Sequence, residues 1–253
     1  SITTDAGGTV SISGNITTSG AQTYNEAATL TAAATLSASS ITTGSTFNAS
    51  TFAFTLTTDA IALGGNLSGS GALVVQPKTA GTTIGMGSSI TSTSCGGAVC
   101  ALNFTDAELG YINQTFSSIT VGSSSGTGAM AYYPTSSVTW VAPLTLRSSS
   151  GTITASATLN TGTNSLTVTS GGAVSLAGIT SGTLGVTGTG ITLNNNVTTS
   201  GTQTYTGAVT LGGDSTLSSL GNGSNGSNIT FSSTLNSATS ARALTITAGT
   251  GTV

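Results

Sequence analysis

The chain has 253 residues, of which only 4% are charged, and its formal net charge is −3. Ordinary globular domains carry about 25% charged residues. The three basic residues, Lys78, Arg147 and Arg242, are too few for a footprint on nucleic acid or on an anionic lipid surface. With no histidine and only six scattered carboxylates, the sequence offers no pair of nucleophile and base. We therefore predict that the chain is not an enzyme and has no catalytic residues, metal site or cofactor.

No apolar run approaches the ~18 residues of a membrane-spanning helix, so we predict no membrane span. The sequence begins at Ser1 with the same alternating pattern as the rest of the chain, and it shows neither a signal peptide nor an initiating methionine. This start favours a mature product or a segment of something longer.

Short apolar runs alternate with glycine, serine and asparagine along residues 1–90. Thr9–Ser13 alternates with period two, Thr51–Thr57 places Phe52, Phe54 and Leu56 on one face, and Ala72–Val75 forms a further run. Short strands with frequent turn signals indicate a sandwich, a barrel or a solenoid.

A near copy within the chain favours the solenoid. Asn15–Leu30 and Asn196–Leu211 share eleven of sixteen residues, and solenoid coils stack on copies of themselves. We predict an all-β fold, a right-handed parallel β-helix that forms a single domain over residues 1–253. At roughly 20–30 residues a coil, it would have about ten coils.

The regular alternation of short strands and turns is interrupted over residues 91–147, which predicts one irregular insertion. Within it, Thr105 and Glu108 match the capping box that begins a helix, so we expect a short helical turn over Asp106–Ile112. Asp106 and Glu108 point apart at this spacing and do not form a catalytic pair. Negative charge near a helix N-terminus explains both.

The chain has two cysteines, Cys95 and Cys100, which bracket a six-residue segment. Without histidine they cannot complete a four-ligand zinc site within the chain. We predict a structural disulfide, and the alternative is a pair of buried free thiols.

Three of the large aromatic residues cluster inside the insertion: Tyr132, Tyr133 and Trp140. One interpretation is a binding surface for a glycan or a protein partner. The other is a plug that fills a widened coil. Tyr24 and Tyr205 occupy equivalent places in the repeated text and are interpreted as members of a stacked ladder.

T-x-T triplets suggest a further hypothesis, an ice-binding face, which needs one flat and regular array. The triplets begin at Thr29, Thr55, Thr152, Thr167 and Thr245. Their uneven separations along the sequence do not define such an array.

The T-x-x-G-x-Q-T-Y-x-x-A-x-T-L units, together with D-A-E-L-x-x-I…F-x-x-I-T-V-G at Asp106–Gly122, resemble the repeat regions of filamentous-haemagglutinin-type adhesins. The resemblance implies a secreted bacterial β-helix at the cell surface or in the extracellular space, serving as a fibre or an adhesin.

Two functions follow as hypotheses. The first is an extracellular structural protein, a segment of a surface fibre that continues in a longer solenoid or stacks head to tail on copies of itself. The alternative is an adhesin passenger that binds a glycan or host surface through residues 91–147. A β-helical polysaccharide lyase or hydrolase ranks last, because the six acidic residues are scattered along the sequence.

Overall fold

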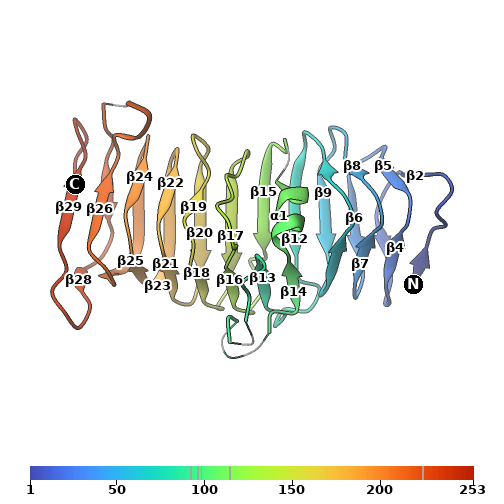
Figure 1. Cartoon of the computed structure of the whole chain (residues 1–253), viewed down its shortest axis with the longest axis horizontal. Helices are drawn as coiled ribbons and strands as arrows, with labels where there is room; N and C mark the ends of the chain where they lie inside the picture. Colours follow the sequence, from blue (N-terminus) through green and yellow to red (C-terminus); the bar gives the residue numbers. More distant parts are fainter. Residues whose placement is uncertain (92, 96, 98, 114, 224) are drawn as a thin grey trace.

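The computed structural model describes residues 1–91, 93–95, 97, 99–113, 115–223 and 225–253. The chain forms a parallel β-solenoid of about 11 turns with one short helix, which confirms the predicted all-β parallel solenoid. Its strands lie across the long axis of a rod, with the N-terminus at one end and the C-terminus at the other (Figure 1).

Each coil contributes strands to three faces of the rod. Face 1 contains, in stacking order, β3 (Ile16–Thr17), β6 (Ala34–Ser37), β9 (Phe54–Thr57), β12 (Ala72–Gln76), β15 (Ser118–Gly122), β17 (Leu144–Ser148), β20 (Leu166–Ser170), the first half of β23 (Leu184–Leu193), the first half of β25 (Gln203–Leu211) and β27 (Ile229–Phe231).

Face 2 contains β1 (Ile2–Thr3), β4 (Gln22–Tyr24), β7 (Ile41–Thr43), β10 (Ile61–Leu63), β14 (Leu102–Phe104), β13 (Ile84–Met86), β16 (Met130–Tyr132), β18 (Ile153–Ala155), β21 (Val174–Leu176), the second halves of β23 and β25, and β28 (Leu235–Ser237). Face 3 contains β2 (Thr9–Ile12), β5 (Ala27–Leu30), β8 (Phe47–Asn48), β11 (Leu67–Ser68), α1 (Asp106–Ile112), β19 (Leu159–Asn160), β22 (Ile179–Ser181), β24 (Val197–Thr199), β26 (Ser215–Ser218) and β29 (Leu244–Thr247). A 3-10 turn, η1, follows β26 at Gly221–Gly223.

The core is a set of apolar columns inside the rod. Successive side chains of a strand point to opposite sides, and β20 accordingly alternates between buried and exposed residues. On face 1, Leu36 pairs with Leu56, and Leu56 pairs with Val75. The stacking is in register, so an apolar residue in one coil covers an apolar residue in the next.

Coil length varies along the rod. Leu36 and Leu56 are 20 positions apart (56 − 36), whereas Leu166 and its partner Leu184 are 18 apart (184 − 166). The turns at the corners absorb these differences, because strand pairing fixes only the residues within the faces. These two coils therefore lie at or just below the lower limit of the roughly 20–30 residues predicted from the sequence.

The insertion reverses the order of two strands on face 2. β13 precedes β14 in the chain, yet β14 lies nearer the N-terminal end, where it contacts β10, and β13 pairs with β16. The helix α1 then takes the place of a strand on face 3 and packs against β10, β11 and β14. An α-helix is roughly 10 Å wide, about two strand spacings, so it spans the extra strand.

The predicted helical turn over Asp106–Ile112 is therefore confirmed with its bounds. Residues 91–147 also include β14, β15, β16 and the start of β17, which pair in parallel as rungs of the solenoid. This stretch departs from the regular coil in the reversed order of β13 and β14, in the helix α1 that replaces a strand, and in the connections between the strands.

The repeated text occupies different faces at its two occurrences. Asn15–Leu30 supplies β3, β4 and β5 on faces 1, 2 and 3, whereas Asn196–Leu211 supplies β24 on face 3 and β25 on faces 1 and 2. The repeated segment therefore keeps its order of strands and turns on a different set of faces, although its second copy joins the last two strands into one continuous strand, β25.

Close stacking at the corners makes some glycines sterically essential. A Cβ atom added to Gly151, which is buried, would lie 2.0 Å from the carbonyl oxygen of Gly128 in the neighbouring coil. Around Gly190, no heavy atom beyond its chain neighbours lies within 4 Å of such a Cβ.

We expect Gly151→Ala to lower the free energy of unfolding by about 2 kcal/mol or more, because backbone atoms must separate. Urea denaturation measures this change, with Gly190→Ala as the matched control. The control should leave stability unchanged or slightly raised. Equal effects of the two substitutions would contradict the proposed packing.

Candidate functional site

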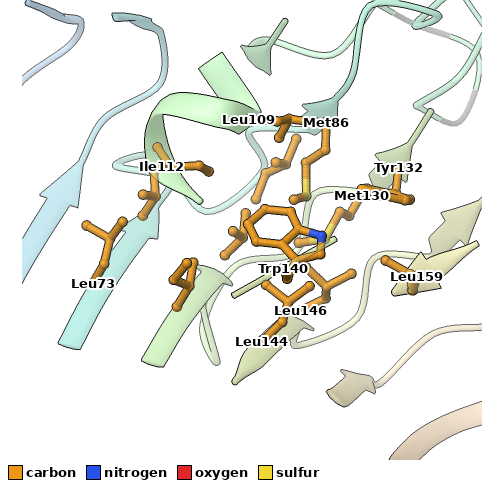
Figure 2. Packing of buried hydrophobic residues seen from close by; sticks show 14 of the residues in the cluster. Leu73, Met86, Leu109, Ile112, Met130, Tyr132, Trp140, Leu144, Leu146 and Leu159 are labelled. Carbon is orange, nitrogen blue, oxygen red and sulfur yellow. The ribbon is translucent and has the colours of Figure 1, made fainter. Parts of the chain in front are cut away.

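The aromatic cluster lies inside the rod and not on its surface. Trp140 and Tyr132 are both 0% exposed, and Tyr133 is half-buried. Trp140 lies on face 3, where its backbone N–H donates to the carbonyl of Asn160 at 2.8 Å. In Figure 2 its indole ring lies among Met86, Met130, Leu144 and Leu146.

The interpretation of Tyr132 and Trp140 as an exposed binding surface is therefore wrong. Their position fits the alternative, a plug for a widened coil, since the extra strand on face 2 leaves space that small β-branched residues would not fill. The sequence left both interpretations open, because the proline-flanked segment around these residues has no clear alternation that would show which side chains point inward.

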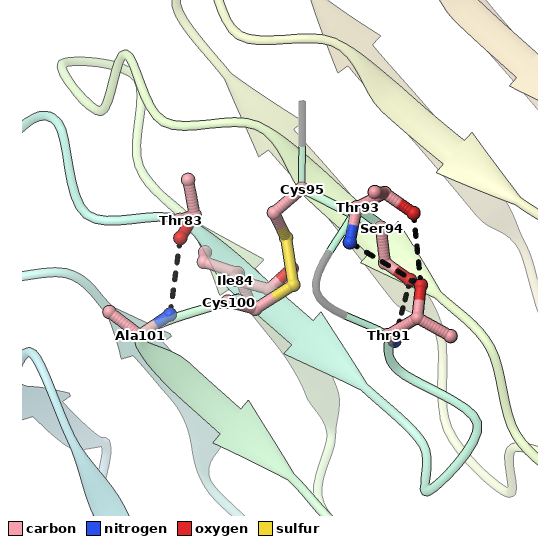
Figure 3. Close-up of a disulfide and its surroundings, with 8 residues drawn as sticks. All are labelled: Thr83, Ile84, Thr91, Thr93, Ser94, Cys95, Cys100 and Ala101. Atoms are coloured by element: carbon pink, nitrogen blue, oxygen red, sulfur yellow. Dashed lines mark hydrogen bonds between the residues drawn. A yellow bond between two sulfur atoms is a disulfide. The ribbon is translucent and has the colours of Figure 1, made fainter. Parts of the chain in front are cut away.

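The predicted disulfide between Cys95 and Cys100 is confirmed, with 5.4 Å between the Cα atoms. Both cysteines are buried and pack with Ala131, Ile90 and Tyr133. The bridge lies in the connection between β13 and β14, and Figure 3 shows it beside Ile84 of β13. It closes the loop in which the chain reverses its stacking direction.

The carboxylate of Glu108 serves two backbone segments. One oxygen accepts hydrogen bonds from the N–H and hydroxyl of Thr105, at 2.8 and 2.9 Å, which completes the capping box. The other accepts the N–H of Leu63 at 2.7 Å. Leu63 is the last residue of β10, so the carboxylate occupies the place of a backbone carbonyl at the end of that strand.

Asp106 connects two surface loops. Its carboxylate accepts from the N–H of Ser88 at 2.9 Å and from both the N–H and the hydroxyl of Thr135. Burial alone would raise the pKa of Asp106, but these hydrogen bonds outweigh it and lower the pKa. Both acids of the insertion thus have structural roles, and their carboxylates engage different partners.

Asp59 clamps the turn that follows β12. Its two oxygens accept from the N–H groups of Lys78 and Thr79 and from the hydroxyls of Thr79 and Thr82, at 2.6–3.0 Å. Here too burial acts to raise the pKa, and the hydrogen bonds lower it overall. The clamp fixes the path of the chain into the insertion.

The two copies of the repeated segment, Asn15–Leu30 and Asn196–Leu211, form the same cluster of hydrogen-bonded buried side chains. The hydroxyl of Tyr24 donates to Oε1 of Gln22 at 3.0 Å, and the hydroxyl of Tyr205 donates to Oε1 of Gln203 at 2.9 Å. Each glutamine amide then donates to a backbone carbonyl of the next coil, at 3.0 and 2.9 Å.

Both tyrosines also contact aromatic neighbours, Tyr24 edge-on to Phe47 and Tyr205 parallel to Phe231. Tyr205 is part of an aromatic ladder, because Phe231 is its in-register partner in the next coil. Tyr24 is not, because its in-register partner is Thr43 and Phe47 lies on face 3.

The outward residues of face 1 form a surface feature that the sequence did not reveal. Most of its strands direct two or more positions outward, and one of these positions is threonine in most coils. In register along the rod, this column reads Thr35, Thr55, Val74, Thr120, Thr145, Thr167, Gly185, Thr204 and Thr230.

Among the described residues, no group of three or more His, Cys, Asp or Glu side chains is placed to hold a metal ion, and no pocket is found there. No helix in the described ranges is long and apolar enough to span a membrane. The remaining candidates for function are therefore the outer faces of the rod and its two ends.

Comparisons with protein-family models, with curated proteins and with solved structures found no match to this chain.

The buried phenols predict how stability depends on pH. Burial raises the pKa of Tyr24 to about 12, and burial is also the main cause that raises the pKa of Tyr132 to about 12. Unfolded tyrosines ionise near pH 10, so between about pH 10 and about pH 12 the unfolded state binds fewer protons than the folded state.

The stability that the neutral phenols contribute is fully present below about pH 10 and falls as the pH rises towards about 12. Urea midpoints measured across this range should decrease, and Tyr24→Phe should make the decrease shallower. A midpoint that stays constant up to about pH 12 would contradict the burial of these phenols.

Proposed function

We propose that this chain is a structural segment of an extracellular bacterial fibre, a rod whose two ends each stack on a further solenoid coil. The β-solenoid fold is compatible with a structural or adhesin-like repeat protein. The resemblance of the repeats to those of adhesins supports an extracellular location and a fibre.

The observation that carries the proposal is the state of the two terminal coils. β1, β2 and β3 lie at the N-terminal edges of their sheets, and β27, β28 and β29 lie at the C-terminal edges. Each of these strands has a strand partner on one side only, and such edges are templates for further pairing.

Apolar side chains at both ends continue the inner columns. Val10 and Ile16 at one end, and Phe231 and Ile246 at the other, pack against the core yet remain only partly buried. Ile246, for example, follows Leu217 in an inward column of face 3. A further coil would cover these residues and remove their apolar surface from water.

Both ends offer the same kind of surface, parallel edges over apolar columns. The coil that covers them comes either from more of the same polypeptide or from another copy. Contact between copies would join the C-terminal coil of one to the N-terminal coil of the next, which is a heterologous contact and builds open filaments.

The alternative function, an adhesin passenger that binds a glycan through residues 91–147, has lost the exposed aromatic surface it relied on. We therefore do not propose glycan binding through Tyr132 or Trp140. Attachment of cells or beads to glycans that survives Ile246→Lys would favour the alternative over the fibre.

We expect the purified chain to associate into rods as its concentration rises, as seen by sedimentation velocity and electron microscopy. About 11 turns at ~4.8 Å a strand give an axial repeat of about 50 Å. Ile246→Lys should abolish association, because it places a charge in the apolar column at the stacking end.

The matched control is Thr180→Lys, which introduces the same charge at an exposed outward position of β22. It should leave association intact. A chain that stays monomeric at every concentration, or a control that blocks association as strongly as Ile246→Lys, would overturn end-to-end stacking.

A further inference from the structure

Four consecutive rungs of face 1, on β20, β23, β25 and β27, carry a two-dimensional array of threonines. Its first column contains Thr167, Gly185, Thr204 and Thr230, and its second contains Thr169, Thr187 and Thr206. We call these seven residues the threonine lattice. All of its threonines are exposed.

Strand geometry makes this array regular in both directions. Neighbouring rungs lie ~4.8 Å apart, and the two outward positions of one strand lie roughly 6.6 Å apart. On face 2 of these coils, the outward positions Gly190 and Ala208 lie beside Thr192 and Thr210, and on face 3 β22 and β24 have a single outward position each. Face 1 therefore carries the most extensive two-column array of threonines among the described residues of these coils.

The hydroxyls of the lattice are free to bind an external partner. Within the described part of the chain, none of the six threonine hydroxyls makes a hydrogen bond, whereas inward hydroxyls such as those of Ser170 and Thr199 bond to nearby carbonyls. Threonine is β-branched and stiff at χ1, so hydroxyl and methyl groups repeat with little freedom.

The chemistry of the lattice excludes several kinds of partner. It contains no charged residue to attract nucleic acid, a mineral or an anionic lipid, and the nearest charge in its second column is Arg147, one rung before Thr169. It contains no aromatic side chain on which a sugar ring could stack, because Tyr205 and Phe231 of the same strands point inward.

A neutral grid of regularly spaced hydroxyl and methyl groups matches an ordered array of water. The oxygen repeats on the prism faces of hexagonal ice lie close to both spacings of the lattice. We propose that the threonine lattice is an ice-binding surface, with crystalline water as its ligand.

This surface is not the array that the T-x-T triplets would suggest. Of the five triplets, those beginning at Thr55 and Thr167 lie on face 1, whereas those at Thr29, Thr152 and Thr245 lie on other faces. The lattice draws its other threonines from β23, β25 and β27, which stack beside β20 in register.

The experiment compares the 253-residue chain with three variants by thermal hysteresis and by inhibition of ice recrystallisation. Thr204→Tyr places a bulky ring in the centre of the lattice and should remove most of both activities. Thr180→Tyr, the control at an exposed position on face 3, should leave them unchanged. Circular dichroism melts verify that both variants keep the fold.

Gly185→Thr should increase activity, because Gly185 is the only one of the seven lattice residues that is not a threonine. A Cβ atom at Gly185 meets no heavy atom within 4 Å beyond its chain neighbours, so the substitution fits and should raise thermal hysteresis above that of the original chain.

The original chain lacking both activities, or binding crystalline cellulose or chitin but not ice, would overturn the proposal. So would Thr180→Tyr losing as much activity as Thr204→Tyr, or Gly185→Thr lowering it. The end-stacking variant Ile246→Lys lies outside the lattice and should keep its ice activity, which separates this proposal from the proposed fibre.

Discussion

Parallel pairing of each coil with the coils before and after it is the constraint on which the whole structure depends. A backbone N–H or C=O buried without a partner costs free energy, so each coil must present its strands in register with its neighbours. Register aligns inward positions such as Leu56 and Val75 into apolar columns. It equally aligns outward positions, so any residue type that recurs there becomes a column on the surface.

Where the regular pairing between strands is interrupted, side-chain oxygens accept the backbone N–H groups that a neighbouring strand would otherwise pair. Glu108 accepts the N–H of Leu63 where α1 replaces a strand, and Asp59 accepts four donors around the turn that leads into the insertion. Trp140 fills the widened interior. Several of the few charged and large aromatic residues are thus located where the coil departs from its standard form, and they hold the rod together there.

Local features were predictable from the sequence, whereas stacking was not. The capping box of Thr105 and Glu108 marked the helix, and the spacing of Cys95 and Cys100 marked the disulfide, because both depend on neighbouring residues. The reversed order of β13 and β14, the burial of Trp140 and the threonine column depend on which coils meet. Val74 and Thr120 are adjacent in that column although 46 positions separate them (120 − 74), so no fixed period in the sequence could reveal it.

The register of face 1 underlies the fold, the open ends and the threonine lattice, and spin-label distances test it most directly. The native cysteines are paired, so labels attach selectively at Thr55→Cys combined with Thr167→Cys or Thr204→Cys. These positions lie four and six rungs from Thr55, which predicts narrow distributions near ~19 and ~29 Å. Distances that do not grow with the number of rungs would contradict the stacked register.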